Sequence, residues 1–311
     1  MDSAQDRFAA DLERIVPAGR LGVAVSGGPD SLALLLLAAA ARPGAVEAAT
    51  VDHGLRPDSG EDARIVARLC GDLDVPHATL PVTVAAGASL QAKAREARYA
   101  ALTDWAEGRG LSAIATAHHA EDQAETLLMR LARGAGLSGL AGVRARRELG
   151  QVMLVRPLLG WRKEELAAIV AGAGLTAADD PANSDPRHDR TRVRKLLGQA
   201  PWLDPAAVAA SAAHLAEAEQ ALQFAADRLW LERVVLNEDE LALQAHGLPR
   251  ELQRRLLLLA IERLGDRPPR GSDLDRALAA LLRGEGCTLG SLKLAGGAVW
   301  RIAPAPPRRL S

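Results

Sequence analysis

Six residues near the beginning of the chain have the types and the spacing to hold a phosphate group. They read Ser26-Gly27-Gly28-Pro29-Asp30-Ser31 and stand between two apolar runs, Leu21–Val25 and Leu32–Ala41. A buried strand, a glycine turn and a helix start leave backbone N–H groups free to point at an anion. Two adjacent glycines also remove the Cβ atoms that would keep a ligand away from the backbone. This segment therefore predicts a phosphate cradle.

Two common phosphate loops are excluded by the spacing. The Walker loop requires Gly-x-x-x-x-Gly-Lys-Ser/Thr, and the dinucleotide loop requires Gly-x-Gly-x-x-Gly. The pattern Ser-Gly-Gly-x-Asp-Ser instead resembles the pyrophosphate loop of ATP pyrophosphatases, which cleave ATP to AMP and pyrophosphate. The alternative is a purely structural role, in which Asp30 and Ser31 are residues favoured in the first turn of a helix.

Acidic side chains are the second group that could do chemistry. Asp122 and Glu125 stand three residues apart in a predicted helix and so share a face. Mg²⁺ prefers one or two carboxylates together with phosphate oxygens, which makes Asp30 and Asp122 the expected metal ligands. Glu125 is expected to bind metal or an ammonium group, although an isolated pair of this kind is usually a solvated helix face. Of the adjacent His118 and His119, we expect one to contact nucleotide and the other to pack.

The elements that must position these residues alternate between strand and helix over the first two thirds of the chain. The expected strands are Leu21–Val25, Val46–Val51, Ala78–Val82 and Ala113–Thr116. The expected helices are Leu32–Ala41, Gly60–Leu73, Leu90–Gly108 and Ala120–Arg133. Such alternation predicts an α/β fold with a Rossmann-like, doubly wound parallel sheet covered on both faces. Ligands bind beyond the carboxyl ends of strands in these sheets, so the polar clusters are expected to meet in one crevice.

The length of 311 residues suggests two domains. We expect a catalytic domain over residues 1–200, with a helical subregion at about 153–200, and a linker at 200–205. Residues 205–311 are expected to form a mostly helical domain that ends in a small β element. Its predicted helices are Ala206–Leu236 and Arg250–Leu264, and Gly296-Gly297 is expected to turn a hairpin within Gly286–Ala303.

Composition narrows the class of protein. Hydrophobic residues make up 48% and charged residues 25%, which is typical of a globular chain. There is no apolar stretch of membrane-spanning length and no signal peptide pattern at the N-terminus. The 2 cysteines are far apart, which fits a reducing cytoplasm. The net charge of −1 excludes an overall basic chain, but the stretches Arg130–Arg147 and Arg187–Lys195 are locally basic and could follow a phosphate backbone or simply be solvated.

Beyond the phosphate loop, five ordered motifs carry a resemblance to a known family. They are Val51–Arg56, Gly87–Tyr99, Thr116–Leu140, Arg156–Leu159 and Asp180–Arg194. Together they resemble the tRNA(Ile)-lysidine synthetases of the pyrophosphate-loop superfamily, densely over about residues 20–200 and loosely elsewhere. The chain departs from the family pattern at Glu121, where aspartate is common, and at Thr191, where asparagine is expected.

The resemblance implies an ATP-dependent ligase that joins free L-lysine to C2 of the wobble cytidine in the CAU anticodon of tRNA(Ile). First the C2 oxygen of cytidine attacks the α-phosphate of ATP and pyrophosphate leaves. Then the lysine amine attacks C2 and AMP leaves. The modified tRNA reads AUA in place of AUG and is charged with isoleucine instead of methionine. The cofactors implied are ATP and Mg²⁺, and no protein partner or membrane is expected.

The resemblance also implies roles for individual residues. Those expected to take part in catalysis are Asp30, His118, Asp122, Glu125 and Arg95. The loop Ser26–Ser31 is expected to hold pyrophosphate, with His53 beside the adenosine. The residues expected to contact the tRNA are Arg130, Arg133, Asn183, Arg190 and Arg194. The region after residue 205 is expected to help grip the tRNA.

Three other functions compete with this one. Thiolation of tRNA uses cysteine pairs or Cys-x-x-Cys ligands, and neither pattern occurs with Cys70 and Cys287. Amide synthesis on a small molecule usually couples the same loop to an ammonia source, and no glutaminase domain is visible. A non-enzymatic RNA-binding module would explain the basic patches but would leave Asp30, Asp122 and the phosphate loop unexplained.

Overall fold

The protein divides into two compact units. The computed structural model describes residues 2–16, 19–52, 59–83, 90–175, 189–237, 240–265 and 267–305. Contacts within the chain separate Met1–Ala216 from Glu217–Ser311. The boundary falls inside one long helix, α9 (Pro205–Arg233), which begins where the sequence predicts the end of a linker.

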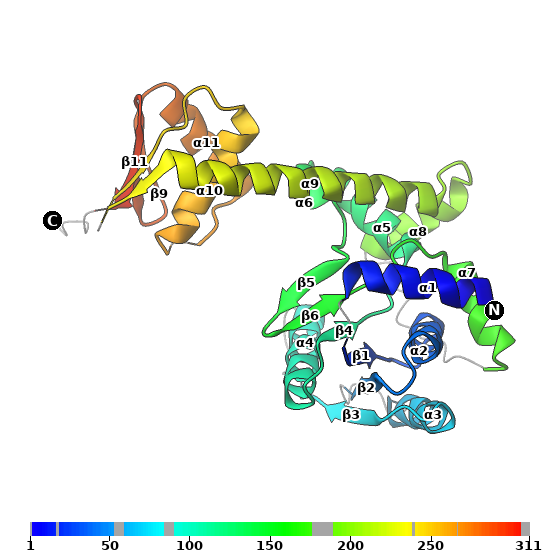
Figure 1. Ribbon diagram of the computed structural model, residues 1–311. Helices are drawn as coiled ribbons and strands as arrows, with labels where there is room; N and C mark the ends of the chain where they lie inside the picture. The colour runs from blue at the N-terminus through cyan, green and yellow to red at the C-terminus, as the bar shows by residue number, and fades with distance from the viewer. Residues whose placement is uncertain are drawn as a thin grey trace. The chain divides into compact units, whose positions relative to one another are not determined.

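A six-stranded sheet forms the centre of the first unit, in the order β3-β2-β1-β4-β6-β5 (Figure 1). Its strands are β1 (Leu21–Ala24), β2 (Val46–Asp52), β3 (His77–Pro81), β4 (Ala113–Ala115), β5 (Arg146–Leu149) and β6 (Val152–Val155). All neighbours pair in parallel except β5, which runs antiparallel to β6. Strand order reverses between β1 and β4, so the crevice at their carboxyl ends is the expected ligand site. The Rossmann-like fold class is confirmed.

Helices cover both faces of this sheet. The helices that precede α9 are α1 (Asp2–Ile15), α2 (Pro29–Ala41), α3 (Ser59–Asp72), α4 (Leu90–Gly108), α5 (Ala120–Leu131), α6 (Leu137–Leu140), α7 (Lys163–Gly172) and α8 (Asp189–Gln199). One core joins the sheet to α1, α2, α3 and α7, with Phe8, Leu34 and Trp161 fully buried in it. A second core joins the opposite face to α4, where Leu102 is fully buried. Gly22 is required there, since a Cβ on it would lie 2.8 Å from the Trp105 ring.

The structure differs from the sequence prediction at the far edge of the sheet. The subregion at about 153–200 is expected to be helical, but its first residues belong to β6, which pairs in parallel with β4. The run is short and entirely apolar, and such a run is equally compatible with a helix and a buried strand. Helices α7 and α8 do lie within the subregion.

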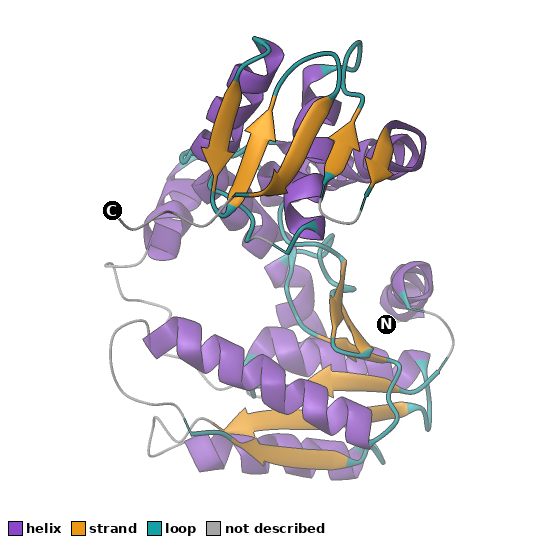
Figure 2. Cartoon of the chain, turned by 90° about the vertical axis from the view of Figure 1, so that its left-hand side faces the viewer, coloured by secondary structure: helices purple, strands orange, loops and turns teal. Residues whose placement is uncertain are grey.

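The second unit combines helices with a five-stranded antiparallel sheet in the order β7-β8-β11-β10-β9 (Figure 2). Its elements are β7 (Val234–Leu236), β8 (Leu241–Leu243), α10 (Arg250–Arg263), α11 (Gly271–Leu282), β9 (Gly286–Leu289), β10 (Leu292–Ala295) and β11 (Trp300–Pro304). The helical C-terminal region is confirmed, and Gly296-Gly297 lies in the turn between β10 and β11 as predicted. The predicted helix Ala206–Leu236 is too long, because Val234 and Val235 leave α9 to pair with β8.

In the part of the chain that the structure describes, no helix has both the length and the apolar character that crossing a membrane requires.

Candidate active site

The phosphate loop has the geometry of a strand-to-helix turn. Gly27 has φ 87°, a backbone conformation that favours glycine, and α2 begins directly afterwards with Pro29 at its first position. The Ser31 hydroxyl accepts a hydrogen bond from the Ser26 backbone N–H at 3.1 Å and donates one to the Gly28 carbonyl at 2.9 Å. These contacts fold the loop back on itself and fix the start of α2. The helix begins earlier than the sequence prediction, which placed its start at Leu32.

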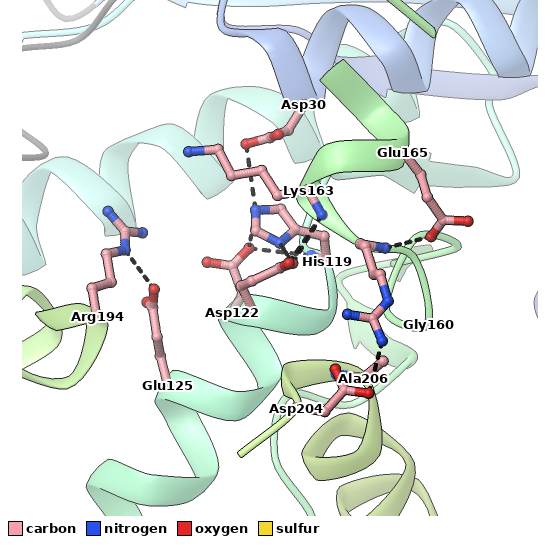
Figure 3. Close-up of polar contacts among 12 residues, drawn as sticks. Asp30, His119, Asp122, Glu125, Gly160, Lys163, Glu165, Arg194, Asp204 and Ala206 are labelled. Carbon is pink, nitrogen blue, oxygen red and sulfur yellow. Dashed lines mark hydrogen bonds and ion pairs between the residues drawn. The ribbon is translucent and has the colours of Figure 1, made fainter. Parts of the chain in front are cut away.

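Three carboxylates surround His119, which lies at the start of α5 (Figure 3). Its Nε2 lies 3.4 Å from Asp30 Oδ2 and 3.6 Å from Asp122 Oδ2, and its Nδ1 lies 2.8 Å from Glu121 Oε2. Burial by itself would lower the pKa of His119, but hydrogen bonds to Asp30 and Glu121 and the charge of Asp122 raise this pKa to about 10. His119 is therefore a cation that brings the carboxylates of α2 and α5 together.

Asp30 and Asp122, the expected metal ligands, meet at one histidine nitrogen. Asp122 Oδ2 also accepts a hydrogen bond from the His119 backbone N–H at 3.2 Å. Asp30 Oδ1 is buried and has no hydrogen-bond partner among the described residues. Within the described ranges, no group of three or more His, Cys, Asp or Glu side chains is arranged to hold a metal by itself. Two carboxylates suit Mg²⁺, which takes its remaining ligands from phosphate oxygens and water.

His118 lies in a different electrostatic environment from its neighbour. Burial lowers the pKa of His118 to about 4; Arg156, Arg95 and Arg98 act in the same direction and Asp122 opposes them. His118 is therefore neutral, with its Nδ1 3.1 Å from the Thr116 hydroxyl.

Glu125 pairs with the two arginines that the sequence analysis placed near the tRNA base. Its side chain is 2% exposed, and its Oε1 accepts a hydrogen bond from Arg194 Nε at 2.5 Å. Arg190 Nε lies 3.9 Å from Oε2, which is buried and has no hydrogen-bond partner among the described residues. Burial raises the pKa of Glu125 although Arg194 opposes this effect. Helix α8 packs against α5 and thus brings Arg190 and Arg194 to Glu125; Figure 3 shows the contact with Arg194.

The remaining predicted residues are distributed around this centre. Arg95 is exposed and stacks on Tyr99, with its guanidinium 5.1 Å from the ring centre. Arg130 donates to the Gly139 and Gly142 carbonyls at 2.6 and 2.9 Å, so it holds the turn after α6. Arg133 pairs with Asp189 of α8 at 2.5 Å. His53 and Asn183 lie outside the described residues.

The sequence analysis included Arg156 in a family motif without assigning it a role, and it did not predict the central position of His119. Arg156 follows the buried strand β6, is 3% exposed, and donates to the Arg144 carbonyl at 2.6 Å. A charged residue between apolar Val152–Val155 and Leu158-Leu159 is the signal that could have identified it. For His119 the signal was its place directly before a helix whose first turn carries Glu121 and Asp122.

Comparison with known proteins identifies the family. A family model described as a PP-loop domain matches residues 2–200. A tRNA(Ile)-lysidine synthase of Novosphingobium aromaticivorans is 49% identical over 313 residues, covering 99% of this chain and 96% of the relative. Another from Zymomonas mobilis is 44% identical and covers 94% of this chain and 90% of the relative.

The chain belongs to the tRNA(Ile)-lysidine synthase family. A solved structure of a U34-tRNA thiolase from Methanococcus maripaludis, with a [4Fe-4S] cluster, has the same fold at a TM-score of 0.57 and 14% identity, covering 68% of this chain and 77% of that one. At this identity the likeness concerns the fold alone. The lysidine synthase family member described here has only 2 cysteines, Cys70 and Cys287, which lie in different units and form no disulfide.

Proposed function

We propose that this protein joins L-lysine to C2 of the wobble cytidine in the CAU anticodon of tRNA(Ile), consuming ATP and releasing AMP and pyrophosphate. Its family membership over nearly the whole chain supports this proposal. The observation that carries it is a pair of buried carboxylate oxygens, Asp30 Oδ1 and Glu125 Oε2, with no hydrogen-bond partner among the described residues. Both carboxylates have charged partners, Asp30 in His119 and Glu125 in Arg194, but a buried acceptor without a hydrogen bond costs about 1–3 kcal/mol. Each of the two oxygens can therefore accept a donor or a cation that a ligand supplies.

The first ligand is the metal that accompanies ATP. Asp30 and Asp122 would hold Mg²⁺, which neutralises charge on phosphate oxygens as pyrophosphate leaves. The loop Ser26–Ser31 stands beside them and offers backbone N–H groups and the N-terminus of α2 to the leaving pyrophosphate. Both features serve the first step, in which the cytidine C2 oxygen attacks the α-phosphate.

The second ligand is lysine. Glu125 Oε2 offers a buried acceptor to an ammonium group of the substrate. The attacking amine must lose a proton, and a carboxylate whose pKa is raised by burial is a suitable acceptor for it. Arg194 and Arg190 hold this carboxylate in place from α8. Glu125 therefore serves the second step, in which lysine displaces AMP from C2.

The tRNA is bound by cations of the first unit and by the region after residue 205. Helix α8 carries four cationic residues, Arg190, Arg192, Arg194 and Lys195, and follows the predicted base-contacting residue Asn183 along the chain. Phosphate contacts of this kind fix the register of an RNA, while an unpaired base is recognised in a pocket. A tRNA substrate and two unpaired thiols fit a cytoplasmic protein.

The direct test is lysine incorporation. Purified protein is mixed with ATP, Mg²⁺, radiolabelled lysine and tRNA(Ile) bearing a CAU anticodon, and label is measured in the tRNA. The matched control is the same tRNA with uridine at the wobble position. We expect label only with cytidine and only with ATP. No label in the verified substrate would refute the proposed function.

A further inference from the structure

One tryptophan is displayed at the surface next to the cationic helix α8. Trp202 is 81% exposed, whereas Trp161 and Trp300 are each 1% exposed. An indole is a large, rigid surface that contributes little to folding when it is left in water. Single exposed apolar side chains are common, so exposure alone assigns no role to Trp202.

The backbone around Trp202 is held firmly on both sides. Ala200 is 7% exposed, and its carbonyl accepts a hydrogen bond from the Leu203 N–H at 2.8 Å. Asp204 accepts hydrogen bonds from the Ala206 N–H at 3.1 Å and from Arg162 at 2.7 Å (Figure 3). The turn between α8 and α9 is therefore pinned to α7 and to the start of α9. Because the backbone is already ordered, only the side-chain torsions of Trp202 lose entropy when it binds a partner.

The helix that precedes Trp202 in the chain is cationic. Arg192 and Lys195 stand three residues apart on α8, and the uncharged Gln199 continues their row toward the turn. Lys195 has no ion-pair partner in the described part of the chain. Of the acids nearest in sequence, Asp189 pairs with Arg133 and Arg192, and Asp204 pairs with Arg162. A partner for this surface should therefore be anionic.

Proteins that bind single-stranded nucleic acid combine exposed aromatic rings with cationic side chains, and Trp202 in the turn after the cationic helix α8 supplies such a ring. Arg194, which contacts Glu125 in the site, precedes the end of α8 by five residues, about 8 Å along the helix axis. We propose that Trp202 stacks on an unpaired base of the tRNA anticodon loop while the wobble cytidine occupies the site at Glu125. This inference rests on the proposed function.

The test compares three substitutions at one position: Trp202→Ala, Trp202→Phe and Trp202→Leu. The Ala variant should bind an anticodon stem-loop RNA roughly 5-fold to 100-fold more weakly than the wild type, the range found for loss of a base-stacking aromatic. The Phe variant keeps a ring face and should retain most of the affinity. The Leu variant keeps apolar bulk without a ring and should resemble the Ala variant. The KM values for ATP and lysine should not change in any of them.

Two results would overturn the inference. Wild-type affinity in the Ala variant or in the Leu variant would show that the indole does not stack on a base. A change of oligomeric state in the Ala variant, measured by sedimentation, would show that Trp202 is covered by protein. Both results leave lysine incorporation by the wild type intact, whereas failure of the proposed function removes that incorporation itself.

Discussion

The substitution Glu125→Gln should separate the stability of the protein from its activity. A hydrogen bond to a charged partner contributes about 1.5–3 kcal/mol, and Arg194 at 40% exposure is partly screened by water. Burying the Glu125 carboxylate costs several kcal/mol, which offsets that gain. We therefore expect the free energy of unfolding of the variant at pH 7 to equal the wild-type value or to exceed it by about 1 kcal/mol.

The pH dependence of this difference follows from the pKa of Glu125, which burial raises in the folded state. The folded state then binds the proton more readily than the unfolded state, so this group destabilises the fold as pH rises through the interval between the two pKa values. The cost is fully present only above the raised pKa of the folded state. The stability gap between variant and wild type should close as pH falls below about 4.3, the ordinary pKa of glutamate.

Activity should respond in the opposite direction. The substitution removes the proposed ion pair between Glu125 and the substrate ammonium, and loss of one partner of such a buried pair costs about 2–5 kcal/mol of binding, so kcat/KM for lysine should fall roughly 30-fold or more. The matched control is Glu219→Gln, which affects a nearly buried pair with Arg255 in the second unit. That variant should lose stability and keep its KM for lysine. A Glu125→Gln protein that is less stable than the control and keeps wild-type KM for lysine would refute the reasoning.

Three further outcomes are expected. Gly27→Ala should raise the KM for ATP about tenfold, because the backbone angle φ of 87° at this position costs an L-residue about 1–2 kcal/mol. The control is Gly44→Ala, where φ is 71° and the added Cβ meets open space, so that the backbone strain is similar but ATP binding should not change. Equal KM values for ATP in the two variants would contradict a role for the loop. Asp122→Ala should lower turnover at least about 100-fold with an unchanged circular dichroism spectrum, and near-normal turnover would remove Asp122 from the site. Burial raises the pKa of the Cys70 thiol to about 11, so this thiol should not react with a disulfide reagent at pH 8 until denaturant is added. Rapid labelling of Cys70 in the native protein, located by mass spectrometry, would contradict its burial.

The sheet of the first unit could be predicted because its strands and helices alternate with clear periodicity. The predicted helix Leu90–Gly108 matches α4 at both ends. The glycine turn at residues 26–28 separates β1 from α2 and so indicates where the strand ends and the helix begins. The strands β6, β7 and β8 could not be predicted, because they stand outside the regular alternation of strand and helix that identifies the equally short β1 and β4. Such strands are stabilised by partners distant in sequence, as β6 is by β4, and nothing within their own residues distinguishes them.

The sequence predicts which acidic residues belong to the candidate site, but it does not predict which side chains they contact. Asp30, Asp122 and Glu125 were identified as the acids, and their partners depend on the packing of α5 against α2 and α8. Only the folded structure shows that His119 stands between Asp30 and Asp122, or that Glu125 faces Arg194 instead of sharing a site with Asp122. A pattern of spacing identifies residues on one face of one helix, and it carries no information on which helix lies opposite.

The central claim is that two sets of acids serve two successive steps, Asp30 and Asp122 in adenylation and Glu125 in lysine transfer. It is tested most directly with ATP labelled at the α-phosphate, by following label on the tRNA in single turnovers. In the presence of lysine, the wild type should carry label only transiently, and Glu125→Gln should accumulate labelled tRNA. Asp122→Ala should form none. A Glu125→Gln protein that neither adenylates tRNA nor consumes ATP, although it is folded, would contradict the division of labour.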